Sequence, residues 1–290
     1  MHVEVNGTCL WFDVEGPSVV PNGRSMRELP TVVLLHGGPG SYDHSYFKPY
    51  FARLIDHAQI VYLDLRDHGR SQRNRPTDWC FEACADDVRA FCDAVGIVRP
   101  IVAGHSMGGC VAMLYAIRHP GHASGLLLLS TMARLDLDRL TDGFRRIAGE
   151  RVAELARRDF SGESVTDDEW YRVFAAFGPT VPTAEELARR VGNPDVADHG
   201  MELLRRFDVI DGLARVVSPA LVSVGTLDPV TPLAAAQEIV DALPAGLGRL
   251  HVMNGAGHFA WLDRADEFWP AVIDFVGSRD LFAASSVTAY

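Results

Sequence analysis

Lysine is nearly absent from this chain of 290 residues, and its arginines form no basic cluster. The formal net charge is −11 with histidine taken as neutral, and the acidic residues do not gather in a tail. A nucleic-acid partner requires a basic face. The composition therefore predicts no nucleic-acid partner.

Long apolar runs are missing as well. No segment approaches the roughly 18 consecutive apolar residues that a membrane span requires. Residues 1–16 also lack the basic start and apolar stretch of a signal peptide. We therefore expect a cytoplasmic protein without a membrane partner.

A disulfide framework is not expected either, because the cysteines are odd in number and include no CxxC pair. The five cysteines are Cys9, Cys80, Cys84, Cys92 and Cys110. Cys80 and Cys84 could share a helix face and, with a histidine, suggest a metal site. Free thiols in a reducing compartment are the favoured interpretation, and no metal is predicted.

Six short and nearly continuous apolar runs predict strands that are covered on both faces. They span residues 31–35, 60–65, 100–103, 126–129, 220–224 and 250–253. Helical patterns alternate with them at 81–95, 107–119, 232–243 and 265–276. Two alternating segments at the N-terminus predict an antiparallel pair, followed by a Pro/Gly-rich connector at 16–30. The alternation is typical of a doubly wound α/β sheet.

The alternation breaks once, between the runs at 126–129 and 220–224. Helix-like, charge-rich stretches fill this interval without a convincing strand, and it is too long for an ordinary connection. We therefore predict a helical cap at 133–215, inserted into a core domain of residues 1–132 and 216–290. An independent second domain is the alternative, but about 80 residues of modest apolar content would form a poor core alone.

The segment Gly104-His105-Ser106-Met107-Gly108 lies between a predicted strand and a predicted helix. In that setting G-x-S-x-G describes a nucleophile elbow, in which a tight turn exposes the serine above a helix N-terminus. The alternative is a structural Gly-Ser turn. We predict that Ser106 is the nucleophile.

A glycine-rich turn, His36-Gly37-Gly38-Pro39-Gly40, directly follows the strand at 31–35. Acyl transfer creates an oxyanion, which needs hydrogen-bond donors already aimed at it. One backbone N–H can come from this turn and the other from the residue after the nucleophile. These donors are predicted to be Gly38 and Met107, with His36 stabilising the loop.

The acid and base are expected later in the chain, in the order Ser, Asp, His. Asp228 follows the strand at 220–224, and His258 ends a flexible loop after the strand at 250–253. Serine needs a base to remove its proton, and the histidine needs a carboxylate to fix its tautomer. We predict a catalytic triad of Ser106, His258 and Asp228. A helix cap is the alternative role for Asp228, and Asp64 is the competing carboxylate.

Four blocks resemble the proline iminopeptidase (prolyl aminopeptidase) branch of the α/β-hydrolase superfamily. They are HGGPG at 36–40, DLRDHGRS at 64–71, GHSMGG at 104–109, and the pair GTLDPVTP with GAGHF. The resemblance implies an α/β-hydrolase fold, with a mostly parallel doubly wound sheet and an inserted helical cap. It places the family roles on Ser106, Asp228 and His258, with Gly38 and Met107 at the oxyanion hole. The chain departs from the family pattern at Asp67, where glycine is usual, and at Met107, where iminopeptidases often have tryptophan.

The resemblance implies hydrolysis of an N-terminal residue from small peptides or amides, without a cofactor. Holding the substrate's amine requires carboxylates near the active site, and the acidic and aromatic segment at 167–171 is the favoured lining. Substrate contacts are predicted at His105, Glu169 and Trp170. A carboxylesterase or lactonase is the alternative, followed by a C–C bond hydrolase and a non-catalytic binding protein. The expected partner is a small molecule or short peptide, and a homo-oligomer is compatible with the sequence.

Overall fold

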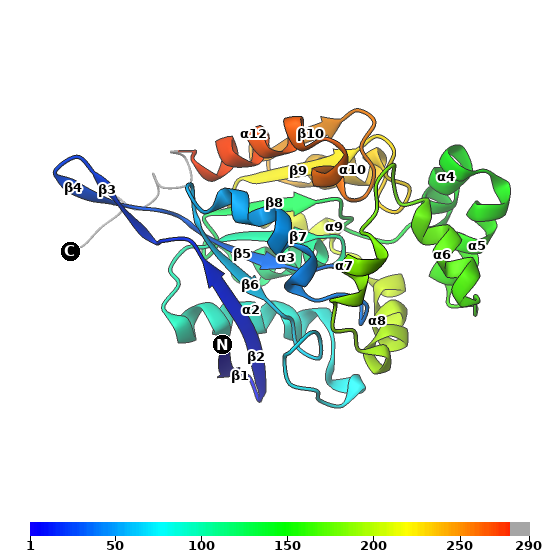
Figure 1. Ribbon diagram of the computed structural model, residues 1–290, viewed down its shortest axis with the longest axis horizontal. Helices are drawn as coiled ribbons and strands as arrows, with labels where there is room; N and C mark the ends of the chain where they lie inside the picture. The colour runs from blue at the N-terminus through cyan, green and yellow to red at the C-terminus, as the bar shows by residue number, and fades with distance from the viewer. Residues whose placement is uncertain (279–290) are drawn as a thin grey trace.

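The computed structural model describes residues 1–278, and an eight-stranded sheet forms its centre (Figure 1). The strand order is β1-β2-β6-β5-β7-β8-β9-β10. β1 and β6 each pair with β2 in antiparallel fashion, and the other neighbours are parallel. The strands of this sheet are β1 (His2–Val5), β2 (Thr8–Glu15), β5 (Thr31–Leu35), β6 (Gln59–Leu63), β7 (Ile101–His105), β8 (Gly125–Leu129), β9 (Ala220–Gly225) and β10 (Gly248–Met253).

Helices cover both faces of the sheet, which explains why its central strands are apolar on both sides. In β5, Val33 and Leu35 pack into one apolar cluster, and Val32 and Leu34 pack into another. The first cluster includes residues of α2 (Phe81–Val95), α3 (Met107–Arg118) and α10 (Leu233–Ala242). The second includes residues of α1 (Lys48–Phe51), α11 (Ala260–Asp263) and α12 (Ala265–Val276). The predicted α/β-hydrolase fold is confirmed.

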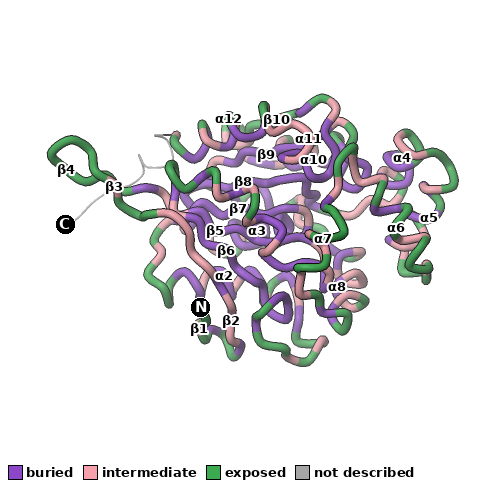
Figure 2. Tube along the Cα trace, in the orientation of Figure 1, coloured by how far each residue is buried: buried purple, intermediate pink, exposed green. Residues whose placement is uncertain are grey.

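The segment predicted as a connector at 16–30 contains a hairpin. Its strands are β3 (Val19–Asn22) and β4 (Ser25–Glu28), joined at Gly23, whose φ is +62°. The hairpin projects from the body of the molecule and is mostly exposed (Figures 1 and 2). The two-residue loop is Gly23-Arg24, and a glycine at the first central position of such a loop is a hairpin signal. The sequence interpretation missed it because these segments lack the apolar face of a core strand.

The chain between β8 and β9 is mainly helical, with one isolated antiparallel bridge between Arg134 and Asp208. Its helices are α4 (Leu137–Ala148), α5 (Glu150–Ser161), α6 (Asp167–Ala175), α7 (Ala184–Ala188), α8 (Pro194–Arg206) and α9 (Ile210–Leu213). We call residues 133–215 the cap. Leu140, Phe144, Phe160 and Val173 form a small apolar cluster there, which Val230 of the core joins. The cap therefore packs partly on the core.

The carboxyl ends of the parallel strands carry the residues that the sequence singles out. The His36 loop follows β5, Ser106 follows β7, Asp228 follows β9 and His258 follows β10. Because parallel strands end at one edge of a sheet, these four loops lie together there. Within residues 1–278, no helix has the length and apolar character needed to cross a bilayer.

Candidate active site

Ser106 occupies a strained turn between β7 and α3, with φ 54° and ψ −123°. A residue other than glycine rarely adopts such a backbone conformation unless the surrounding structure enforces it. Flanking glycines permit the turn: a Cβ on Gly104 would lie 2.1 Å from the carbonyl oxygen of Gly108. A Cβ on Gly108 would lie 2.2 Å from the carbonyl oxygen of Leu35. The spacing of the G-x-S-x-G segment is thus a steric requirement of this elbow.

Asp228 and His258 form a buried pair on neighbouring loops. Asp228 Oδ2 lies 2.9 Å from His258 Nδ1, and neither side chain is more than 3% exposed. The other oxygen, Oδ1, accepts the N–H groups of Val230 and Thr231 at 2.9 Å each. The Thr231 hydroxyl donates to Oδ2 at 2.6 Å. With Nδ1–H donated to this carboxylate, Nε2 of His258 is the nitrogen free to accept a proton.

Asp64, the competing carboxylate, has a different partner. Its Oδ1 accepts from Nδ1 of His44 at 2.7 Å and from the His44 N–H at 2.9 Å. Its Oδ2 accepts the N–H of Arg70 at 2.8 Å. Burial acts to raise the pKa of Asp64, but the hydrogen bond and charge of His44 outweigh it and hold that pKa below its usual range. Asp64 therefore belongs to a buried network beneath the loops, and the structure pairs His258 with Asp228.

The predicted oxyanion donors lie on two backbone segments beside Ser106. Met107 is the first residue of α3, where an N–H has no intrahelical acceptor. Gly38 lies in the loop after β5 with φ 56°, and a Cβ there would lie 2.8 Å from Cδ2 of Tyr42. Nδ1 of His36 lies 3.1 Å from the Gly37 carbonyl oxygen, while its Nε2 accepts the Leu65 N–H at 3.2 Å. Because the peptide is trans, this bond turns the Gly38 N–H away from His36.

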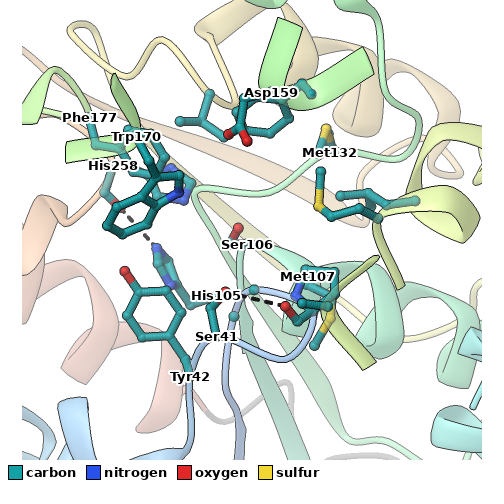
Figure 3. A pocket seen from close by; sticks show the side chains of 18 of the residues that line it. Ser41, Tyr42, His105, Ser106, Met107, Met132, Asp159, Trp170, Phe177 and His258 are labelled. Carbon is teal, nitrogen blue, oxygen red and sulfur yellow. Dashed lines mark hydrogen bonds between the residues drawn. The ribbon is translucent and has the colours of Figure 1, made fainter. Parts of the chain in front are cut away.

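A cavity of about 240 Å³ opens above Ser106, between the core and the cap. The Ser106 hydroxyl points into it, with His258 on one side and Met132 on the other (Figure 3). The core contributes the loop after β5, Ser106, Met107 and His258, and the cap contributes residues of α5, α6 and α8. The residues that line the cavity include Ser41, Tyr42, Tyr46, His105, Asp159, Phe160, Trp170, Phe177, Asp198, Met201 and Leu204.

A family model described as the alpha/beta hydrolase fold matches residues 30–265. The chain belongs to the α/β-hydrolase fold family. The strand order, the serine elbow and the buried Asp-His pair agree with this family match, which covers most of the chain.

Among its relatives, the hydrolase is 27% identical over 287 residues to the proline iminopeptidase PfmaB of Pestalotiopsis fici, covering 91% of this chain and 94% of that one. It is 28% identical over 260 residues to a pimeloyl-[acyl-carrier protein] methyl ester esterase of Neisseria meningitidis, covering 87% and 96%. A crystal structure of a proline iminopeptidase from Mycobacterium smegmatis superposes with a TM-score of 0.75 at 26% identity, covering 98% and 99%. The resemblance to this branch is confirmed, and the chain is a hydrolase of this fold.

Asp159 is a cavity residue that the sequence interpretation missed. It lies on α5 at the cap wall, and its carboxylate and the Ser106 hydroxyl point toward the same space (Figure 3). Within residues 1–278, that half-buried carboxylate forms no hydrogen bond or ion pair, and burial alone raises its pKa. Its position could have been a signal, because it follows the buried Leu155 and Ala156 by four and three residues. That spacing puts an acid on the apolar stripe of an amphipathic helix.

The three predicted substrate contacts have different places in the structure. Trp170 lines the cavity and stacks on Phe174 with ring centroids 5.1 Å apart. His105 also lines the cavity, but both its ring nitrogens already have hydrogen-bond partners. Glu169 is not a lining residue: its carboxylate accepts the Thr166 N–H at 2.9 Å in an exposed capping box of α6. The structure therefore places Glu169 away from the cavity, because helix capping takes its carboxylate.

Within residues 1–278, one cluster has the composition of a metal site, namely Asp43, His44 and Asp64. The carboxylates already have donors, however. Asp43 Oδ1 accepts from Ser45 and its Oδ2 accepts the Val191 N–H at 3.1 Å, while Asp64 binds His44 and Arg70 as described. These carboxylates bind protein donors and hold loops together.

The cap touches both catalytic loops through its backbone. The His258 N–H donates to the Phe177 carbonyl oxygen at 2.7 Å, and the Asn193 N–H donates to the Gly40 carbonyl oxygen at 2.7 Å. A Cβ on Gly257 would lie 2.2 Å from Cα of Gly178, so the backbone segments at these two glycines cross in direct contact. The cap is therefore bonded to the loop that bears the predicted base and to the loop that bears a predicted oxyanion donor.

Proposed function

We propose that this hydrolase is an aminopeptidase of the proline iminopeptidase type, which removes an N-terminal residue from small peptides or amides. The observation that carries the proposal is the carboxylate of Asp159 in the cavity above Ser106, which has no hydrogen-bond or ion-pair partner among residues 1–278. The cap's contribution there is otherwise mostly apolar, as Phe160, Trp170, Phe177, Met201 and Leu204 illustrate.

In the proposed reaction, Ser106 Oγ attacks the carbonyl carbon of the substrate while His258 Nε2 takes the hydroxyl proton. Asp228 holds the imidazole in the required tautomer and stabilises its positive charge. The N–H groups of Gly38 and Met107 bind the negative oxygen of the tetrahedral intermediate. His258 then returns the proton to the leaving amine as the C–N bond breaks, which leaves an acyl-Ser106 ester.

Water completes the proposed cycle. His258 removes a proton from a water molecule, whose oxygen attacks the acyl carbon and passes through a second oxyanion in the same site. The proton then returns to Ser106 as the ester bond breaks. The free amino acid and the regenerated serine are the products.

Asp159 gives this chemistry its preference for a free N-terminus. An α-amino group has an ordinary pKa of about 7.7–8.0, so it is mostly cationic at neutral pH. A carboxylate that is half-buried and has no cation of its own gains an ion pair when such a substrate binds. Because the carboxylate is half-buried, solvent screens that ion pair less than it screens one on the surface.

The three relatives described above are named for two activities, and one feature of the cavity favours the second. Two of the three relatives described above are named as proline iminopeptidases, and the third as a methyl ester esterase. The apolar side chains around Met201 and Leu204 would suit the neutral acyl group of an ester. A carboxylesterase or lactonase acting through the same Ser106 intermediate is therefore the second candidate.

The test compares prolyl and alanyl arylamides with a free amine, their N-acetyl derivatives, a matched aryl ester and a lactone. The wild-type enzyme should prefer the free arylamides by roughly 10² to 10³ in kcat/KM. Asp159→Asn should remove most of that preference and leave ester turnover nearly unchanged. Asp198→Asn is the matched control, because Asp198 lines the same cavity but is exposed to solvent. Equal rates on blocked and free substrates, or ester turnover without arylamide cleavage, would select the esterase or lactonase.

We also propose a cytoplasmic location. All five cysteines are free. Unpaired thiols persist in a reducing compartment, where disulfides are rare.

A further inference from the structure

A chain of buried hydrogen bonds runs beneath the cavity and joins the two catalytic loops. The Gly37 N–H donates to the Tyr46 hydroxyl oxygen at 2.9 Å. That oxygen lies 3.0 Å from Nδ1 of His105, and Nε2 of His105 lies 3.0 Å from the carbonyl oxygen of His258. Tyr46 and His105 are at most 6% exposed. The chain thus links residue 37 of the oxyanion loop with residue 258, the proposed base.

The direction of the chain follows from its last member. A carbonyl oxygen only accepts, so Nε2 of His105 carries the hydrogen. Burial, reinforced by the nearby His258, lowers the pKa of His105 well below its usual value, and the ring is neutral. Nδ1 therefore accepts from the Tyr46 hydroxyl, which in turn accepts from Gly37. Each of the three bonds has one donor and one acceptor. The N–H of Gly37, the O–H of Tyr46 and the Nε2–H of His105 each donate to the next member of the chain.

We propose that Tyr46 and His105 are positioning residues that fix the oxyanion loop and the His258 loop at a set separation. The inference rests on the proposed acyl transfer at Ser106, and it assigns to His105 a different task from substrate binding. Neither side chain touches the reacting atoms in this assignment. Tyr46 acts through the Gly37 backbone, and His105 acts through the His258 backbone.

Such a link matters because acyl transfer tolerates only small errors in the positions of the oxyanion donors and the base. Oxyanion donors stabilise the transition state only at about 2.7–3.1 Å from the developing charge. The base must at the same moment reach the serine proton within hydrogen-bond distance. These groups sit on loops that follow different strands, β5 and β10, which are not neighbours in the sheet. A direct bonded link between the loops therefore keeps both distances within range together.

Packing is the competing explanation. The ring of His105 also lies against Phe259 and Trp261, with centroids 5.4 and 4.8 Å away. Tyr46 stacks on Phe47 at 4.2 Å. If these contacts alone set the loop positions, the polar atoms of Tyr46 and His105 would be dispensable for turnover.

The experiment uses Tyr46→Phe, His105→Phe and the double variant, with Tyr62→Phe as the control. Tyr62 is a buried tyrosine of β6 outside the cavity lining, and its hydroxyl donates to Glu15 Oε2 at 2.9 Å. The control therefore removes one tyrosine hydrogen bond that belongs to neither catalytic loop. The readouts are kcat and KM on a neutral aryl ester, the rate of Ser106 labelling by a fluorophosphonate, and the thermal unfolding midpoint. The ester and the fluorophosphonate report on acyl transfer whatever the natural substrate is.

Tyr46→Phe should lower kcat and the labelling rate about 10- to 100-fold with KM little changed, since the donors remain but lose their alignment. The double variant should be no slower than the slower single variant, because either change opens the same chain. Tyr62→Phe should stay within about twofold of wild type in kcat and labelling rate, because its hydroxyl bonds to Glu15 and to neither catalytic loop. The inference would be overturned if Tyr46→Phe reacts at the wild-type rate. It would also be overturned if the fold loss in kcat of the double variant equals the product of the fold losses of the two single variants. A wild-type enzyme that the fluorophosphonate does not label would instead overturn the proposed function on which it rests.

Discussion

Asp228 and His105 of the core differ from Asp159 on the cap wall of the cavity in how far protein groups satisfy their polar atoms. The buried polar atoms of Asp228 and His105 all have partners, and those partners are protein groups. On the cap wall, the carboxylate of Asp159 has none within the described residues. A satisfied network holds one geometry, whereas an unsatisfied group gains energy from a ligand. Under the proposed function, the core supplies the reaction and the cap supplies the selection of substrate.

The largest expected effect comes from removing the predicted nucleophile on the core wall. Ser106→Ala should leave the fold intact and lower turnover by about 10⁶, since the triad acts as a unit. Ser41→Ala is the control, because Ser41 lines the same cavity with its hydroxyl 3.3 Å from the Pro39 carbonyl oxygen. Fluorophosphonate labelling followed by peptide mapping should find Ser106 alone. Label on another serine, or activity in the alanine variant, would show that the nucleophile is misassigned.

The next effect tests which carboxylate serves the base. Asp228→Asn should keep the shape of the site but favour the wrong imidazole tautomer, with a loss in kcat of up to about 10⁴. Asp64→Asn should reduce stability more than turnover per folded molecule, because Asp64 pairs with His44. Steady-state kinetics beside thermal unfolding separates the two effects. A nearly wild-type Asp228→Asn together with an inactive but folded Asp64→Asn would require the triad to be redrawn.

A smaller effect concerns the cap wall and follows from pH. Burial raises the pKa of Asp159, so its carboxylate is protonated at a higher pH than an exposed aspartate. As pH falls through that raised pKa, KM for a free-amine arylamide should rise, by about tenfold or more. KM for a neutral ester should stay flat over the same range. Kinetics on both substrates checks this, and parallel KM profiles would show that Asp159 does not meet the amine.

The smallest effect is on stability and has the opposite sign from the effect on activity. A carboxyl group whose folded-state pKa is raised binds protons more readily in the folded protein, so its contribution to stability falls as pH rises through the unfolded and then the folded pKa. Asp159→Asn removes this penalty and should raise Tm at neutral pH by about 1–3 °C. The gain should shrink as pH is lowered toward the raised pKa. Calorimetry at several pH values measures it, and a variant that is less stable at neutral pH would mean that the carboxylate has a stabilising partner.

The same contrast explains what the sequence could predict. Continuous apolar runs marked β5, β7, β8 and β9, since strands covered on both faces have few other solutions. Ser106, Asp228 and His258 could be predicted as a triad because each lies in a loop that follows a strand at one edge of the sheet, where the topology brings such loops together. Apolar periodicity and the residues that follow a strand can be read from short stretches of sequence, so they predict the strands and the candidate triad directly.

The cap residues were harder because their positions depend on how helices pack. Glu169 and Asp159 are both acids on cap helices, yet one closes a capping box and the other lines the cavity. The box could have been recognised from Thr166 and Glu169, three residues apart before an apolar segment. Asp159 required attention to an acid on an apolar stripe. The tasks of Tyr46 and His105 depend on contacts between residues 59 and 153 positions apart, which no local pattern specifies.

The two backbone bonds between cap and core also constrain how enzymes of this shape can be recombined. A cap grafted from another hydrolase would need a carbonyl oxygen where Phe177 offers one and an N–H where Asn193 offers one, or the His258 and Gly40 loops would lose an anchor. It would also need a residue as small as Gly178 where the chain crosses Gly257. Diversity in a library of cap variants is therefore best placed in α4, α5 and α6, while 177–178 and 192–193 are inherited unchanged with the core they fit.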